Sequence, residues 1–231
     1  HDKGYAVTVP ESGRELIETI MDRKAISEFR WTTVDEIVAK GGCLDQLEVS
    51  TYERWWNDFP PAVRERIAGA WGAPPGQAQN GIPAAMVHDG RILVTGVSYG
   101  NAVVLVQPKR GCAGARCDGQ VCKILHDPDV PPPHQYIATY RWLEDVYGAH
   151  AIVHVGTHGN LEFLPGKGVG LSEPCLPDLT LHELPHLYIY NADNPPEGVI
   201  AKRRGIAALV DHMQTVMVRG GLYDELEELE R

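Results

Sequence analysis

The sequence predicts an α/β fold in which a mainly parallel sheet carries helices on both faces, together with a β-hairpin and irregular loops. Amphipathic helical segments alternate along the chain with short apolar strands, the arrangement from which parallel sheets are built. An Asp-Gly pair at 89–90 lies between two strand-like runs and predicts a hairpin turn. Residues 111–133 are polar and contain cysteines and prolines, so we expect a long irregular loop there.

The length and composition of the chain are those of a globular protein. With 231 residues, 43% of them hydrophobic, it can build one large or two small cores. Its character changes at Ala84, after which strand-like segments become frequent. We therefore expect an N-terminal α/β segment at 1–83 and an α/β core at 84–231 that holds the motifs for chemistry.

Capping residues and glycines mark the helices of the N-terminal segment. Ser12 is a natural N-cap, and Glu15 completes a capping box with it. Two successive glycines at 41–42 end a second helix. The predicted elements are a strand at 5–9 and helices at 13–22, 34–40 and 62–71, with an aromatic stretch at 52–59.

The second part of the chain alternates between strands and helices. A short apolar, β-branched run at 151–155 ends at Gly156 and is the clearest of its strands. Three prolines between Pro174 and Pro185 predict a loop. The predicted strands are 85–88, 92–97, 102–107, 151–155 and 187–190, and the predicted helices are 134–147, a short one near Leu161, and 196–213.

The most informative segment is His154 to Lys167, which reads HVGTHGNLEFLPGK and follows the strand at 151–155. In α/β proteins, chemistry is concentrated where strands end. Imidazole nitrogens exchange protons near neutral pH and bind borderline metals, and a carboxylate serves as a ligand or base. His154, His158 and Glu162 are therefore the predicted catalytic and metal-binding residues. The alternative is that His154 is a hydrogen-bonded strand residue, Glu162 caps a turn, and only His158 faces a cleft.

A second cluster, Asn191 to Gly205, predicts an anion site. A strand exit there leads through Asn and Pro into a helix, whose free backbone N–H groups attract negative charge. Arginine can hold carboxylates bidentately, although three basic residues on a helix are equally consistent with a solvated face. VQPKRG at 106–111 adds a weaker signal after another strand. The candidate ligand-binding residues in these two segments are Gln107, Arg110, Asn194, Lys202, Arg203 and Arg204.

Charge and cysteine content exclude several classes. A formal charge of −10 argues against a nucleic-acid surface. No apolar run approaches the roughly 20 residues that span a bilayer, and the first residues lack the features of a signal peptide, so we expect a cytoplasmic protein. Five cysteines without a secretory context are expected to be reduced. Cys112, Cys117 and Cys122 recur every five residues, and both a metal role and ordinary loop thiols stay open.

Several blocks together resemble a known family. In chain order they are GNAVVLVQPKRG, YRWLE, HVGTHGNLEFLPGKGVGLSEPCLPDL, LPHLYIYNADNPPEGVIAKRR and GLYDELEELE. They are similar to the large subunit shared by cobaltochelatase and magnesium chelatase, and the likeness extends over nearly the whole chain. Large subunits of that family are several times longer, so this sequence resembles a portion of one.

The resemblance implies insertion of a divalent metal into a tetrapyrrole, with Co²⁺ favoured over Mg²⁺, in cobalamin biosynthesis. It also implies ATP hydrolysis by a separate AAA+ subunit and a bridging subunit with an integrin-like domain. The sequence itself contains no GxxxxGK[ST] phosphate loop. In such a reaction His154 and His158 would deliver metal or accept protons, Glu162 would assist, and Lys167, Arg203 and Arg204 would bind acidic side chains of the macrocycle.

Other functions remain compatible with the sequence. The chain can belong to a magnesium chelatase of (bacterio)chlorophyll synthesis, or it can bind metal or tetrapyrrole without activity of its own. A metal-dependent hydrolase that uses His154, His158 and Glu162 with an activated water is a further alternative. A structural scaffold would bind neither metal nor tetrapyrrole.

Overall fold

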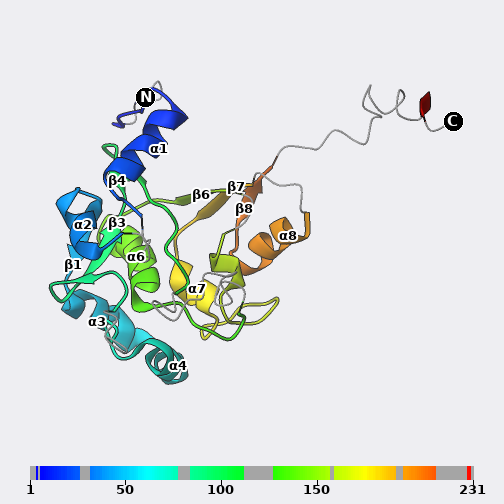
Figure 1. Cartoon of the computed structure of the whole chain (residues 1–231). Coiled ribbons are helices and arrows are strands. Elements are labelled where there is room, and N and C mark those ends of the chain that lie inside the picture. The colour runs from blue at the N-terminus through cyan, green and yellow to red at the C-terminus, as the bar shows by residue number, and fades with distance from the viewer. Residues whose placement is uncertain are drawn as a thin grey trace.

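The computed structural model describes Gly4, residues 6–26, 32–77, 84–111, 127–156, 159–190, 195–211 and 228–229. Helices and three small sheets make up this part of the chain (Figure 1), and the predicted α/β class is confirmed. Parallel pairing is confined to one of the three sheets, and the other two are antiparallel. No helix in the described ranges is long and apolar enough to cross a membrane.

The first antiparallel sheet has the strand order β1-β3-β2 and contains β1 (Cys43–Leu47), β2 (Val87–His88) and β3 (Arg91–Thr95). The predicted hairpin at 89–90 is confirmed, since β2 and β3 pair on either side of it. Asp89 and Gly90 have φ values of 46° and 75°, as a primed hairpin turn requires. Strand β1 was not predicted, because its sequence CLDQL lacks the β-branched residues that signal a strand.

The second sheet pairs β4 (Val97–Ser98) with β5 (Val103–Val104). The predicted strand at 102–107 is therefore reduced to its two valines. An isolated bridge between Val7 and Gly100 is all that remains of the strand predicted at 5–9. Both segments thus run beside other strands but pair too briefly to form longer ladders.

The third sheet is parallel and contains, in this spatial order, β6 (Ile152–Gly156), β7 (His186–Tyr190) and β8 (Ala208–Val210). The predicted helix at 196–213 is wrong in its second half. Helix α8 (Pro195–Arg204) ends before Gly205, Ile206 has a positive φ of 49°, and the chain then pairs with β7. Pairing with β7 outweighs the weak helical signal of these few residues.

Three of the four helices of the N-terminal segment were predicted, and the fourth, α3 (Val49–Asp58), covers most of the stretch that the sequence had marked only as aromatic. The other three helices are α1 (Gly13–Asp22), α2 (Val34–Ala39) and α4 (Pro61–Trp71). Ser12 caps α1, and its hydroxyl accepts a hydrogen bond from the backbone N–H of Glu15 at 3.2 Å. Proline at the first position of α4 needs no hydrogen-bond partner for a backbone N–H.

The remaining helices lie on one side of the parallel sheet (Figure 1). Helix α6 (His134–Asp145) confirms the prediction at 134–147, and the single 3₁₀ turn η2 (Leu161–Phe163) confirms the one near Leu161. Helix α7 (Leu176–Leu181) lies in a segment that the prolines had marked as a loop. Pro177 occupies the first turn of α7, where proline is tolerated. The prolines of this segment therefore did not prevent a helix, and the predicted loop was wrong here.

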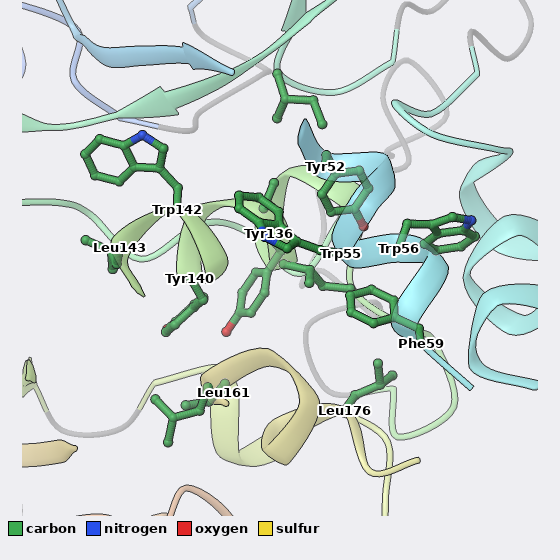
Figure 2. Packing of buried hydrophobic residues seen from close by; sticks show 14 of the residues in the cluster. Tyr52, Trp55, Trp56, Phe59, Tyr136, Tyr140, Trp142, Leu143, Leu161 and Leu176 are labelled. Carbon is green, nitrogen blue, oxygen red and sulfur yellow. The ribbon is translucent and has the colours of Figure 1, made fainter. Parts of the chain in front are cut away.

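The main hydrophobic core lies between α3, α4, α6, α7 and η2, and buried residues of β1, β3 and β6 contribute to it. Nine residues of α6 are buried, and aromatic side chains from α3 and α6 fill the space between these helices (Figure 2). Leu161 and Leu176 close the core from the other side of α6. Residues from both sides of position 84 contribute, and the division into 1–83 and 84–231 stays a prediction.

Buried polar groups in this core are paired across it. The hydroxyl of Tyr52, on α3, lies 3.0 Å from Nδ1 of His134, whose Nε2 is 2.9 Å from the carbonyl oxygen of Gly72. The indole N–H of Trp142 donates to Asp45 at 2.7 Å. These contacts fix the rotation of α6, and α6 in turn presents Tyr140 to the parallel sheet.

Candidate functional site

The candidate site is built around His154 on β6. Alternation along this strand sends Val153 and Val155 to solvent and His154 to the side on which α6 packs. Nε2 of His154 lies 3.1 Å from the hydroxyl of Tyr140, and its Nδ1 lies 3.0 Å from Nε2 of His186. His186 begins the neighbouring strand β7, so parallel pairing brings the two imidazoles together.

The last acceptor of this hydrogen-bond chain fixes its direction. Nδ1 of His186 lies 2.7 Å from the carbonyl oxygen of Gly205, which can only accept, so this nitrogen carries a proton. In a neutral His186, Nε2 then accepts from Nδ1–H of His154. Nε2 of His154 in turn accepts from the hydroxyl of Tyr140. One neutral tautomer of each imidazole therefore satisfies the whole chain.

Gln107 extends the chain into the loop that follows β6. Its side-chain N–H donates to the hydroxyl oxygen of Tyr140 at 2.8 Å, and its Oε1 accepts from the backbone N–H of Asn160 at 2.7 Å. Asn160 immediately precedes η2, so Gln107 ties this loop to α6. Gln107 was predicted to bind a ligand, and in this geometry its amide is engaged by the protein.

Both histidines are neutral at pH 7. Burial, followed by the neighbouring His186, lowers the pKa of His154 to about 3. Burial also lowers the pKa of His186, although the hydrogen bond to Gly205 and the negative charge of Glu162 act in the opposite direction. Protonation would break the one-way order of donors and acceptors. With both of its nitrogens engaged, His154 has none left for a metal ion in this arrangement.

Glu162 lies beside this hydrogen-bond chain, and one of its carboxylate oxygens has no hydrogen-bond partner among the described residues. Only 1% of the residue is exposed, and its Oε1 accepts from the backbone N–H of Gly159 at 2.8 Å. Its Oε2 is buried and has no hydrogen-bond partner among the described residues. A side chain at position 159 would collide with Gln107 and Glu162, since its Cβ would lie 3.0 Å from Gln107 Oε1 and 3.3 Å from Glu162 Oε2. A buried carboxylate oxygen without a partner is costly and is suited to take up a proton or cation.

Two buried tyrosines border Glu162. The rings of Tyr136 and Tyr140 stack at a centroid distance of 5.4 Å, and both hydroxyls point to the side of α6 on which Leu161 lies (Figure 2). Burial raises the pKa of both hydroxyls, and the charge of Glu162 adds to it. These phenols therefore stay protonated at neutral pH and can act only as hydrogen-bond partners.

Two of the predicted ligand-binding arginines hold loops instead. Arg110 is 1% exposed and donates to the carbonyl oxygens of Asp127 at 2.8 Å and Val130 at 3.1 Å. The guanidinium of Arg204 donates at 2.7 to 3.0 Å to three carbonyl oxygens, those of residues 162, 164 and 167. Arg204 thereby fastens the end of α8 to the turn that contains Glu162.

The other predicted ligand-binding cations that the structure describes lie at the surface. Lys167, Lys202 and Arg203 are exposed, the first in the loop after η2 and the other two at the end of α8. Because Arg204 joins these two segments, the three cations belong to the same region of the molecule. Their side chains are exposed to solvent and are accessible to an anionic ligand.

Some predicted residues lie outside the part of the chain that the structure describes. They are His158, Asn194 and the cysteines at 112, 117 and 122. Within the described part, no three His, Cys, Asp or Glu side chains gather in a way that could hold a metal ion. The metal tripod of His154, His158 and Glu162 therefore stays a prediction.

Sequence reasoning overlooked Tyr140 and His186, although signals for both were present. In HLYIY, strand alternation places His186 and Tyr188 on one face, and β6 pairs His154 directly with Tyr188. On α6, Tyr136 and Tyr140 are four residues apart and therefore share a helix face. Reading both patterns together would have pointed to a polar contact with His154.

A comparison with protein families shows the class to which this fold and site belong. The model of the family described as CobN/Magnesium Chelatase matches residues 1–231. The chain belongs to the CobN/magnesium chelatase family.

Individual relatives agree with this assignment. The chain is 56% identical to an uncharacterised protein of Methanocaldococcus jannaschii, over 99% of this chain and 19% of the relative. It is 38% identical to the aerobic cobaltochelatase subunit CobN of Pseudomonas aeruginosa, over 99% of this chain and 17% of the relative. The catalytic subunit of cobaltochelatase from Mycobacterium tuberculosis has a similar structure, with a TM-score of 0.70 at 33% identity, covering 99% of this chain and 19% of that one. The chain thus spans less than a fifth of the length of these proteins.

The neutral histidines should make the fold sensitive to mild acid. An unfolded His154 takes up a proton near pH 6.5, whereas the folded one does not until about pH 3. Stability is therefore fully present above about pH 6.5 and falls below it, by up to about 1.4 kcal/mol per pH unit for each such histidine. Urea unfolding at pH 7.5, 6.0 and 5.5 measures this slope. We expect His154→Gln to reduce the slope; an unchanged slope in that variant would contradict the lowered pKa of His154.

Proposed function

We propose that this chain is the part of a chelatase large subunit in which a divalent metal is inserted into a tetrapyrrole. Co²⁺ is the favoured metal, because the segments LPGKGVGLSEPC and LYDELEELE resemble the cobalt branch of the family more than the magnesium branch. Mg²⁺ is the alternative, since the family description joins both branches. We further propose that ATP is hydrolysed by an AAA+ partner subunit, that a subunit with an integrin-like domain bridges the two, and that the complex acts in the cytoplasm.

The observation that carries this proposal is the unpartnered carboxylate oxygen of Glu162. Metal insertion requires that two pyrrole N–H protons leave the macrocycle as its nitrogens capture the ion. A carboxylate held at Oε1 by Gly159, with a buried Oε2 that has no hydrogen-bond partner among the described residues, is suited to accept such a proton. Because burial strengthens the electrostatic effect of the carboxylate, transfer of a proton from the macrocycle to it also relieves the cost of a buried charge.

The neutral hydrogen-bond chain that links Tyr140, His154, His186 and the carbonyl oxygen of Gly205 supports Glu162 in this role. Its histidines carry no charge that would draw the carboxylate into an ion pair. His154 is then a positioning residue that holds the end of β6 against α6 and β7. We assign delivery of the metal to His158, which directly follows this strand end in the sequence.

The exposed cations suit the periphery of an acidic macrocycle. Lys167, Lys202 and Arg203 can pair with carboxylate side chains of a tetrapyrrole whose nitrogens face Glu162. Asn194, which precedes α8 in the sequence, is proposed to contribute a neutral hydrogen bond to the macrocycle. In this assignment Arg110, Arg204 and Gln107 shape the site through the loops they hold rather than through direct contact.

A Glu162→Gln substitution should separate chemistry from binding. Glutamine keeps the size and the hydrogen bond from Gly159 but cannot accept a proton, so we expect the rate of chelation to fall by about 10²- to 10⁴-fold. The assay uses the longer subunit reconstituted with its ATPase and bridging subunits, with Co²⁺ and Mg²⁺ in parallel. Glu183→Gln, at an exposed turn, is the matched control. Chelation by Glu162→Gln at the wild-type rate would rule out Glu162 as the base.

The role of the surface cations can be tested without turnover. Titration with a soluble acidic tetrapyrrole, followed by absorbance or fluorescence, should give a Kd that rises about tenfold in Arg203→Ala, the loss expected for one charge-assisted contact. Arg14→Ala, on the distant α1, removes an equally accessible arginine and should leave the Kd unchanged. Equal affinities for wild type and Arg203→Ala would remove Arg203 from the binding surface.

A further inference from the structure

One face of the parallel sheet is apolar and exposed. Along each strand, alternate side chains point away from α6 and α8, and none of them is charged. Register places them in two rows of three, since Val153 pairs with Leu187 and Val155 with Ile189, and β7 then continues the rows into β8. The exposed sheet face consists of Val153, Val155, Leu187, Ile189, Ala208 and Val210.

The described chain covers only the opposite face. Ile152 on β6 packs with Leu181 and Leu184 from the α7 region, and Tyr188 on β7 packs with Ala201 of α8. Figure 1 shows α6, α7 and α8 on one side of this sheet. The strand order follows the chain order, so right-handed crossovers place every connection between these strands on the same side. A layer on the exposed sheet face must therefore come from sequence before β6 or after β8.

Exposure of this face is unusual for a parallel sheet. Such sheets occur almost only with both faces covered, and their strands are apolar on both sides for this reason. Val155 is 74% exposed and Val210 is 51% exposed, which is costly for side chains that belong to a contiguous apolar patch. The face thus has the composition of an interior surface.

The length of the relatives indicates what covers it. More than four-fifths of each relative compared lies outside the region that this chain matches. Three strands about 4.8 Å apart make a face roughly 10 Å across, which is the width of a single helix. The absence of charge on the face matches the apolar side of an amphipathic helix rather than a polar partner surface.

We propose that the exposed sheet face docks an amphipathic helix of the same subunit, supplied by sequence outside these 231 residues. This inference rests on the proposed function in treating the chain as one part of a longer chelatase subunit. The docked helix completes a three-layer arrangement and supports β6 from behind, so it stabilises the strand that carries His154. It makes no contact with metal or tetrapyrrole.

Thiol labelling tests this proposal without metal, tetrapyrrole or ATP. Val155→Cys probes the exposed sheet face, and Glu65→Cys, at an exposed polar position of α4, is the control. The buried native Cys175 in the same sample reports that the protein is folded. Labelling of each cysteine is followed by peptide mass spectrometry, in the purified longer subunit and in the 231-residue chain.

In the 231-residue chain we expect Val155→Cys to react as fast as Glu65→Cys. In the longer subunit it should react at least about tenfold more slowly, while Glu65→Cys is unchanged, as expected for a site that opens only by local unfolding. Equal reactivity in the longer subunit would overturn the proposal. Protection already present in the 231-residue chain would also overturn it, and dilution would then distinguish a second copy from the chain's own residues. If the labelling results contradict the docking proposal, the tests of Glu162 and Arg203 still decide the proposed function independently.

Discussion

The carbonyl oxygen of Gly205 is the fixed point on which the site depends. Because a carbonyl can only accept, the 2.7 Å contact to His186 sets one tautomer, which sets the tautomer of His154 and the direction of the Tyr140 hydroxyl. Four elements meet along this chain: the end of α8, β7, β6 and α6. A single wrong protonation state would leave a buried donor facing a donor, so the arrangement is rigid as well as neutral.

This neutrality decides how charge is distributed around Glu162. The two histidines do not compensate its carboxylate, and Arg110 and Arg204 donate to carbonyl oxygens of the loops around it. The site therefore contains one buried carboxylate whose Oε2 has no hydrogen-bond partner among the described residues, surrounded by groups that fix its position. Cations that can meet an anionic ligand lie further out, in the loop after η2 and at the end of α8. This separation of a buried carboxylate from exposed cations supports the proposed binding of a flat, acidic macrocycle.

The sequence predicted elements with strong local signals and missed those made by tertiary pairing. Capping at Ser12 and the Asp-Gly turn at 89–90 are local, and both were confirmed. Strand β8 has three residues directly after a helix, and only its pairing with β7 defines it. The same limit applies to the site. His154 was recognised because its surroundings in the sequence are distinctive, whereas its partner His186 is 32 residues away and becomes visible only when β6 and β7 lie side by side.

The protonation state of the two histidines is the most direct test of this account. Long-range ¹⁵N–¹H NMR spectra of the ¹⁵N-labelled chain, assigned with His154→Gln and His186→Gln variants, report the protonated nitrogen of each imidazole. We expect both rings to be neutral and protonated at Nδ1 at pH 7, and His154 to remain so at pH 5. An Nε2-protonated tautomer or an imidazolium at either position at pH 7 would contradict this account, because the order of donors and acceptors in the hydrogen-bond chain from Tyr140 to Gly205 would then be different.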